Sequence, residues 1–298
     1  MERIDGYLCI DDCEKVLADK DKHQYWVIIN NEEYYFKPAT LPYHELIAYY
    51  AAEILGIEAC YCDLAVLNGE KGIISKSLRN KKDKLVLGDV FLDDYLLNSM
   101  NNIKKMGLSK GMADLIEIDY FEGGYSYSEQ VNNLEIIWQA LEYRYGNKVN
   151  IKEIMNQFVL MYLFTIIFHD VDKHPGNWML IENKEGVNLA PLFDNERIFE
   201  DYCCGVNLST SFNDSGDDIC SSLKEFLKIS SSEYFDFFVI KYDEIISNFD
   251  RILELVERQI GAEIPFIDRG RIVLGFSKNR LMIEKALDSF SKKRCLKN

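Results

Sequence analysis

Residues 169–195 have the sequence HDVDKHPGNWMLIENKEGVNLAPLFDN, in which three polar side chains occur at informative spacings. It directly follows residues 151–168, whose apolar side chains lie on nearly every helical face and predict a buried helix. Asp172 and Asn177 then lie five residues apart in a polar loop. A predicted strand, a turn and a returning strand lead on to Asp194. The pattern therefore places one acid and one amide in a helix-to-strand loop, and a second acid at the end of a hairpin.

These three side chains supply what phosphoryl transfer requires. One carboxylate must take the proton of the acceptor hydroxyl, and oxygen ligands must hold Mg²⁺ against the phosphates of ATP. The Asp-x-x-x-x-Asn spacing matches the catalytic loop of kinases. We therefore expect Asp172 to act as the base, with Asn177 beside it, and Asn177 and Asp194 to bind Mg²⁺. Asp and Asn are also common in ordinary turns, so the interpretation depends on the order of the elements around them.

Outward from this stretch, the chain divides into a strand-rich first part and a helical remainder. Two aromatic and β-branched runs around Asn30 and Asn31 predict a hairpin over residues 24–37. A helix is predicted over residues 43–55, with Gly56 as its stop. We further expect strands at 63–67 and 72–75, a charged lobe edge at 79–85, and helices at 87–106, 132–145, 232–248 and 277–290, within a pattern that is helical after residue 219.

The predicted fold class is α+β, in two lobes that form one kinase-like domain. Residues 1–78 are expected to form a small β-rich lobe with one helix, and residues 79–298 a larger, mainly helical lobe that carries the catalytic and Mg²⁺-binding loops. This is the bilobal outline of a protein kinase. An outline alone is weak evidence of function, because unrelated activities share folds.

The sequence resembles the HipA-like kinases, which are bacterial serine/threonine kinases with a bilobal kinase-like fold. Asp172, His174 and Asn177 match the catalytic loop of that family. Residues 189–194, LAPLFD, match the segment that carries its metal-binding Asp. Residues 34–38, YYFKP, match the strand that carries its ATP-binding Lys. The resemblance therefore implies ATP and Mg²⁺ as cofactors and a protein substrate, with an antitoxin or other regulatory partner as an open question.

The same resemblance, over about residues 24–200, implies the residues that bind the nucleotide. Lys37 would place its ammonium on the α- and β-phosphates, and Glu45 at the start of the next helix would hold that ammonium. Lys76, just past a predicted strand, is a further nucleotide-site residue, for which a solvated strand edge is the competing interpretation. The segment 18–24 departs from kinases, because it contains no glycine to let backbone N–H groups approach the phosphates.

Three other functions stay open at this point. A phosphoinositide kinase uses a similar Asp…Asn loop, but it needs a basic or apolar surface toward the membrane, which this acidic chain does not suggest. A small-molecule kinase is consistent with the same residues, because they do not encode the acceptor. A nucleotide-binding pseudokinase that serves as a binding module would be expected to have lost Lys37, Asp172, Asn177 or Asp194, and all four are present.

Composition limits the partners and the compartment. The formal net charge of −15 argues against direct binding of nucleic acid and against docking on anionic lipid. The eight cysteines contain no CxxC pair, so they are expected to be free thiols in a reducing cytoplasm rather than zinc ligands. The longest apolar run, residues 158–168, is far shorter than the roughly 20 residues that span a membrane. We therefore expect a cytoplasmic enzyme.

Overall fold

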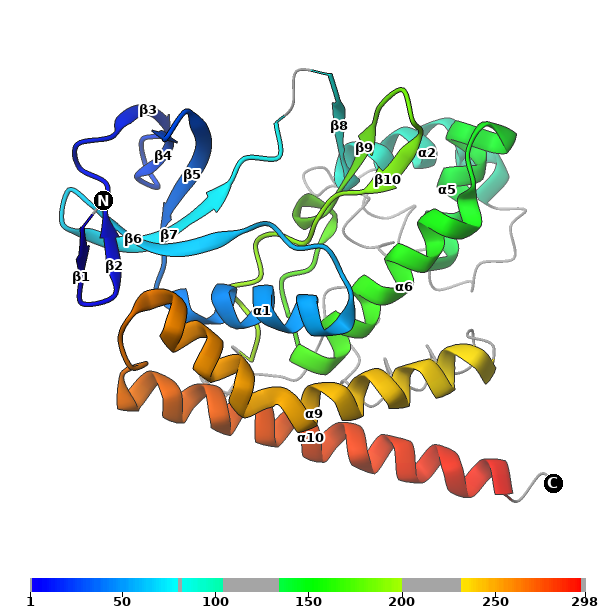
Figure 1. The fold of residues 1–298 in the computed structure, drawn as a ribbon. Helices are drawn as coiled ribbons and strands as arrows, with labels where there is room; N and C mark the ends of the chain where they lie inside the picture. The colour runs from blue at the N-terminus through cyan, green and yellow to red at the C-terminus, as the bar shows by residue number, and fades with distance from the viewer. Residues whose placement is uncertain (1, 80–81, 104–133, 200–231, 296–298) are drawn as a thin grey trace.

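The computed structural model describes residues 2–79, 82–103, 134–199 and 232–295, and Figure 1 draws it as a ribbon. The fold is α+β, which confirms the predicted class: a β-rich N-terminal part precedes a mainly helical C-terminal part.

The N-terminal part is built on a seven-stranded sheet with the order β1-β2-β6-β7-β5-β4-β3. Its strands are β1 (Arg3–Ile4), β2 (Tyr7–Cys9), β3 (Glu14–Asp19), β4 (Gln24–Ile29), β5 (Glu32–Pro38), β6 (Cys62–Leu67) and β7 (Glu70–Lys76). The strands pair antiparallel except for β2 and β6, which run parallel. The predicted hairpin over 24–37 is confirmed, and Asn30 and Asn31 take the positive φ angles of 50° and 65° that its tight turn requires.

Helix α1 (Pro42–Leu55) follows β5 and ends where the sequence predicts. Gly56 takes the left-handed conformation, with φ 73°, and its N–H points back to the carbonyls of Ala52 and Glu53. The helix packs on β6 and β7 on one side and on α6 and α9 on the other. Figure 1 shows it lying between the sheet and the long helices at the C-terminal end of the chain. Glu45, in its first turn, is therefore buried.

The C-terminal part combines a small sheet with long helices. The sheet has the order β10-β9-β8, and its strands are β8 (Lys84–Leu87), β9 (Met179–Glu182) and β10 (Val187–Leu189). The helices are α2 (Gly88–Ile103), α5 (Leu134–Tyr145), α6 (Ile151–Phe168), α9 (Ser232–Ile260) and α10 (Phe266–Cys295), with the short 3₁₀ turns η1 (Gly146–Lys148) and η2 (Pro175–Asn177). The predicted buried helix over 151–168 is confirmed as α6, with those bounds.

The sequence expectation lacks four of the strands: β1, β2, β3 and β8. The side chains of β3 are mostly exposed and show no apolar alternation. A poorly packed edge is expected at 79–85, where Lys84 and Leu85 instead begin β8 through pairing with the distant strand β9. The chain thus leaves the first sheet at Lys76 and enters the second at Lys84, so the predicted lobe boundary at residue 78 stays a prediction. Parts of the expected helices, at 104–106, 132–133 and 219–231, lie outside the described residues.

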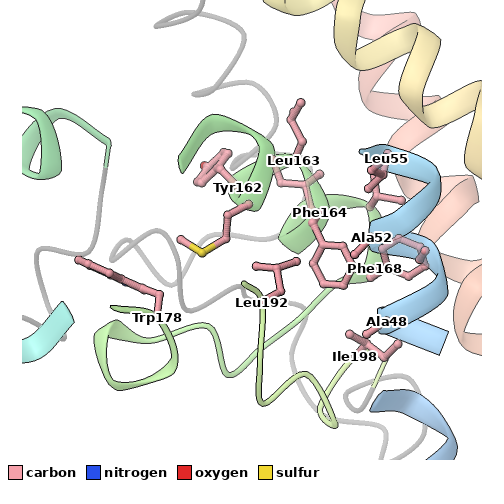
Figure 2. Close-up of a cluster of buried hydrophobic side chains, with 14 of the residues drawn as sticks. Ala48, Ala52, Leu55, Tyr162, Leu163, Phe164, Phe168, Trp178, Leu192 and Ile198 are labelled. Atoms are coloured by element: carbon pink, nitrogen blue, oxygen red, sulfur yellow. The ribbon is translucent and has the colours of Figure 1, made fainter. Parts of the chain in front are cut away.

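A continuous apolar core joins the two parts around α1 and α6. Figure 2 shows Phe164 and Phe168 of α6 pointing toward Ala48 and Ala52 of α1, with Leu192 beside them. By length and composition α6 is apolar enough to cross a membrane, but most of it is buried inside the protein, as in a core helix. The core therefore fixes the end of α6, and the polar loop that follows it, against α1.

Candidate active site

The loop that follows α6 brings Asp172 and Asn177 together. Asn177 donates from Nδ2 to the backbone oxygen of Asp172 at 2.6 Å, and lies 3.4 Å from Oδ2 of its carboxylate. His174 caps η2 by accepting the N–H of Gly176 on Nδ1 at 3.0 Å. His174 thus has a structural contact inside the loop. The loop is folded by its own polar side chains, which hold the expected base and the expected amide ligand next to each other.

Asp194 follows β10 in the left-handed conformation, with φ 55°. Lys37 of β5 forms an ion pair with the Asp194 carboxylate, and its Nζ lies 3.5 Å from Oε2 of Glu196. Burial acts to raise the pKa of Asp194, but the Lys37 ammonium outweighs it and holds that pKa below its ordinary value. Burial likewise acts to lower the pKa of Lys37, and the surrounding carboxylates raise it above the ordinary value. Both groups are therefore charged at neutral pH.

Glu45 lies in the same site but does not hold Lys37 directly. Among the described residues, Lys37 forms ion pairs with Asp194 and Glu196 only. Glu45 instead accepts the backbone N–H of Asn195 on Oε2 at 2.5 Å and the side-chain amide of Asn195 on Oε1 at 3.4 Å. Burial raises the pKa of Glu45 to about 7. Glu45 therefore fixes the residue that follows Asp194, which differs from the contact that the kinase pattern implies.

Lys173 is a functional candidate that the sequence analysis missed. Its side chain is completely buried, and its Nζ donates to the carbonyl of Phe193 at 3.0 Å and to Oδ1 of Asn195 at 2.6 Å. It also lies 3.3 Å from Oδ2 of Asp170, whose Oδ1 accepts the N–H of Asp172. One ammonium thus ties the loop of Asp172 to the segment of Asp194. The available signal was a Lys inside a loop that directly follows the apolar second half of a helix.

Arg197 is a second residue that sequence reasoning missed. Its Nη1 lies 3.1 Å from Oδ1 of Asp172, and both side chains are partly exposed. The guanidinium therefore lies beside the carboxylate that is expected to act as the base.

A cavity of about 600 Å³ opens beside Lys37 and Asp194. Its walls come from the first sheet, including Trp26 and Tyr35, and from the second sheet, including Leu85, Leu87 and Met179. Its size is that of a small-molecule site, and its lining combines apolar side chains with the ion pair of Lys37 and Asp194. That lining suits a nucleotide whose base lies between the sheets and whose phosphates lie toward Lys37.

Lys76 also lines the cavity, but its ammonium is engaged elsewhere. Its Nζ forms an ion pair with Glu32 at 2.7 Å, and the side chains of both residues are about half exposed. This ion pair supports the interpretation of Lys76 as a solvated residue at a strand edge. At the mouth of the same cavity, the guanidinium of Arg79 stacks over the ring of Trp26 at 3.9 Å.

The donor set fits Mg²⁺ bound together with phosphates. No group of three or more His, Cys, Asp and Glu side chains that could hold a metal ion by itself occurs in the part of the chain that the structure describes. Mg²⁺ does not need one, because one or two carboxylate or amide oxygens, water and substrate phosphates complete its octahedral shell. Asn177 and Asp194 offer oxygens of that kind.

No protein-family model matches the chain, and no curated protein sequence matches it. The Helicobacter pylori proinflammatory kinase CtkA matches with a TM-score of 0.61 and 14% identity, over 95% of this chain and 98% of that one. A chain of the Shewanella oneidensis MR-1 toxin–antitoxin complex of HipA, HipB and operator DNA matches with a TM-score of 0.52 and 14% identity, over 92% of this chain and 66% of that one. The chain therefore has a HipA-like, kinase-like fold, as its sequence predicts.

Proposed function

We propose that this chain, which has the fold of HipA-like kinases, transfers the γ-phosphate of ATP to a serine or threonine hydroxyl of a protein. The observation that carries the proposal is the meeting of Lys37 and Asp194 in the lining of a nucleotide-sized cavity. Asp172 and Asn177 are paired on the loop that Lys173 ties to Phe193 and Asn195, the neighbours of Asp194. Lys37, Asp172, Asn177 and Asp194 are of the residue types that kinases use for phosphoryl transfer, and they occur in the same order along the chain.

Each side chain then has a defined task. Lys37 directs its ammonium at the phosphates, and Asn177 and Asp194 supply oxygen ligands for Mg²⁺, which when bound neutralises phosphate charge. Asp172 accepts the proton as the acceptor oxygen bonds to the γ-phosphorus, and the bond from that phosphorus to the β-bridging oxygen breaks to release ADP. Arg197, next to Asp172, can neutralise charge on the transferred group.

The acceptor class follows from the expected base and from the charge of the chain. An aliphatic hydroxyl suits a carboxylate base, and the net charge of −15 favours a protein substrate with a basic surface. This protein's own hydroxyls are further acceptors: Ser75 and Ser77 line the nucleotide cavity, whereas Ser209, Thr210 and Ser211 lie outside the described residues. We propose that the reaction takes place in the cytoplasm, with a regulatory partner that these residues do not identify.

The test is phosphoryl transfer from labelled ATP by the purified protein with Mg²⁺ and candidate protein acceptors. Phosphoserine or phosphothreonine is expected by mass spectrometry, and Asp172→Asn should lower the rate by a factor on the order of 10² or more. Asp250→Asn, which changes an exposed carboxylate on α9 in the same way, should leave the rate unchanged. Wild-type turnover by a folded Asp172→Asn variant would remove Asp172 from the base role. Transfer only to phosphatidylinositol or an aminoglycoside, or ATP binding without transfer, would support one of the three alternatives.

A further inference from the structure

The outer face of α10 carries apolar side chains that the fold does not use. Figure 1 shows α10 at the edge of the molecule, beyond α9. Its inner face already has an apolar stripe, in which the ring of Phe276 stacks on Phe249 of α9 and Ile272 and Ile283 are buried. Asn279, between them, donates to the carbonyl of Ile166 in α6 at 3.1 Å. The packing of α10 on the protein is therefore complete without its outer face.

The exposed apolar residues of that face recur at seven-residue spacing. Ile267, Leu274 and Leu281 are 67%, 51% and 52% exposed, and Phe266 beside the first of them is 89% exposed. Seven residues correspond to two helical turns, so the three side chains lie in one row along the helix, with neighbours about 10 Å apart. Isolated exposed apolar residues are normal, whereas an aligned set on one helix indicates an interaction site. We call Ile267, Leu274 and Leu281 the outer stripe.

Basic side chains accompany the outer stripe at the same spacing. Arg271, Lys278 and Lys285 each follow a stripe residue by four positions and are exposed on the same side of the helix. Arg271 has a long ion pair of 3.9 Å with Asp268. Residues 266–295 contain eight Lys and Arg against three Asp and Glu, in a chain whose net charge is −15. The basic character is therefore local to α10 and follows its apolar stripe.

We propose that the outer face of α10 docks an amphipathic helix of a partner protein that has acidic residues beside its apolar seam. Apolar side chains that recur every two turns on one helix face can anchor the apolar face of a second helix, and charges beside them select the partner by their sign. Acidic flanks on the partner would pair with the row of Arg271, Lys278 and Lys285.

Charge favours an acidic partner helix over two other occupants of this face, a second copy of α10 and an anionic membrane. A second copy of α10, in the parallel or the antiparallel direction, would set Arg271 and Lys278 against the same basic row, and like charges across a seam are unfavourable. An anionic membrane would attract α10 but would repel the rest of this acidic chain.

The experiment uses the full chain and a labelled synthetic peptide of three heptads, with leucine along its seam and glutamate at the flanking positions. Fluorescence anisotropy should show saturable binding that weakens with added salt, because the flanking charges are exposed. Two double variants should each weaken binding at least about tenfold. Leu274→Ala/Leu281→Ala removes apolar contacts, and Lys278→Glu/Lys285→Glu reverses the charges that select the partner. Leu97→Ala, at a similarly exposed leucine of α2, is the matched control and should bind as wild type does.

A second peptide, with the same seam and lysine flanks, should not bind. Equal binding of the two peptides, no binding of the glutamate peptide, or full binding by the Leu274→Ala/Leu281→Ala variant would each overturn the proposal. Preference for phosphatidylserine vesicles over the peptide would assign the face to a membrane instead. Self-association in sedimentation that the same double variant abolishes would assign it to a second copy of the chain.

Discussion

Lys173 shows how much a single buried side chain contributes to this site. Its ammonium is completely buried and contacts oxygens of Phe193, Asn195 and Asp170. We expect Lys173→Met to lower the free energy of unfolding by about 3–5 kcal/mol, because the buried carboxylate of Asp170 then loses its cation. Urea unfolding of the variant measures this loss. Lys152→Met, at an exposed Lys of α6, should change stability by less than about 0.5 kcal/mol.

A second substitution separates this charge effect from a general loss of packing. Adding Asp170→Asn to Lys173→Met removes the unpaired charge, so the double variant should recover part of the lost stability. If the double variant is no more stable than Lys173→Met alone, the Asp170–Lys173 pair does not explain the loss.

Among single residues, the sequence identifies those whose spacing along the chain indicates a function. Asp172, Asn177 and Asp194 were selected in that way, and their proposed roles stay predictions. Lys173 and Asn195 were missed because their importance comes from burial and from contacts with distant residues. The partner of Glu45 is a case of the same kind: its place in α1 was predicted, but its hydrogen bond to Asn195, 150 residues away, depends on tertiary packing.

Among the elements, the start of α2 has the tightest fit to the catalytic loop. A Cβ on Gly88 would lie 2.5 Å from the carbonyl oxygen of Pro175 and 2.5 Å from the ring of Trp178. We expect Gly88→Ala to cost about 1–3 kcal/mol of stability through overpacking, and to weaken Mg·ATP binding because η2, which contains Asn177, must shift. Thermal unfolding and calorimetry with Mg·ATP test the two effects.

The matched control for this change is Gly270→Ala in α10. Its Cβ would meet nothing within 4 Å, so alanine should raise stability by about 0.5–1 kcal/mol through its higher helix propensity. Wild-type stability and wild-type Mg·ATP binding in Gly88→Ala would show that the contact between α2 and η2 tolerates a methyl group.

Elements were predictable where local patterning and packing agree. The hairpin of β4 and β5, helix α1 and helix α6 follow from turn residues, a glycine stop and an uninterrupted apolar run. β8 was not predicted, because four residues with two exposed members show no period and become a strand only beside β9. Strand pairing between distant segments is information that local sequence does not contain.

At the scale of the whole molecule, the cavity lies between two sheets that the chain builds from segments far apart. β4, β5 and β7 form one wall, β8 and β9 form the other, and Lys37 meets Asp194 across 157 residues of sequence. The apolar core around α1 and α6 spans both parts of the chain. A ligand that contacts both walls should therefore stabilise the molecule as one unit.

The ion pair between Lys37 and Asp194 leads to the last prediction, that ATP stabilises the protein only together with Mg²⁺. Without the metal, the phosphates of ATP are repelled by Asp194 and Glu196, and Asp194 already neutralises Lys37. With Mg²⁺, Asp194 gains a divalent partner and the Lys37 ammonium is released to the phosphates. Saturation at about 100 times Kd should add about 2.7 kcal/mol to the free energy of unfolding, and thermal unfolding should show the rise. Asp194→Ala and Asn177→Ala should lose the difference between ATP with and without Mg²⁺, whereas Lys76→Met should keep it, because that ammonium pairs with Glu32 at the strand edge. An equal rise for ATP with and without Mg²⁺ in the wild type, or an undiminished effect of Mg²⁺ in Asp194→Ala, would show that nucleotide binding does not depend on the metal ligands assigned here.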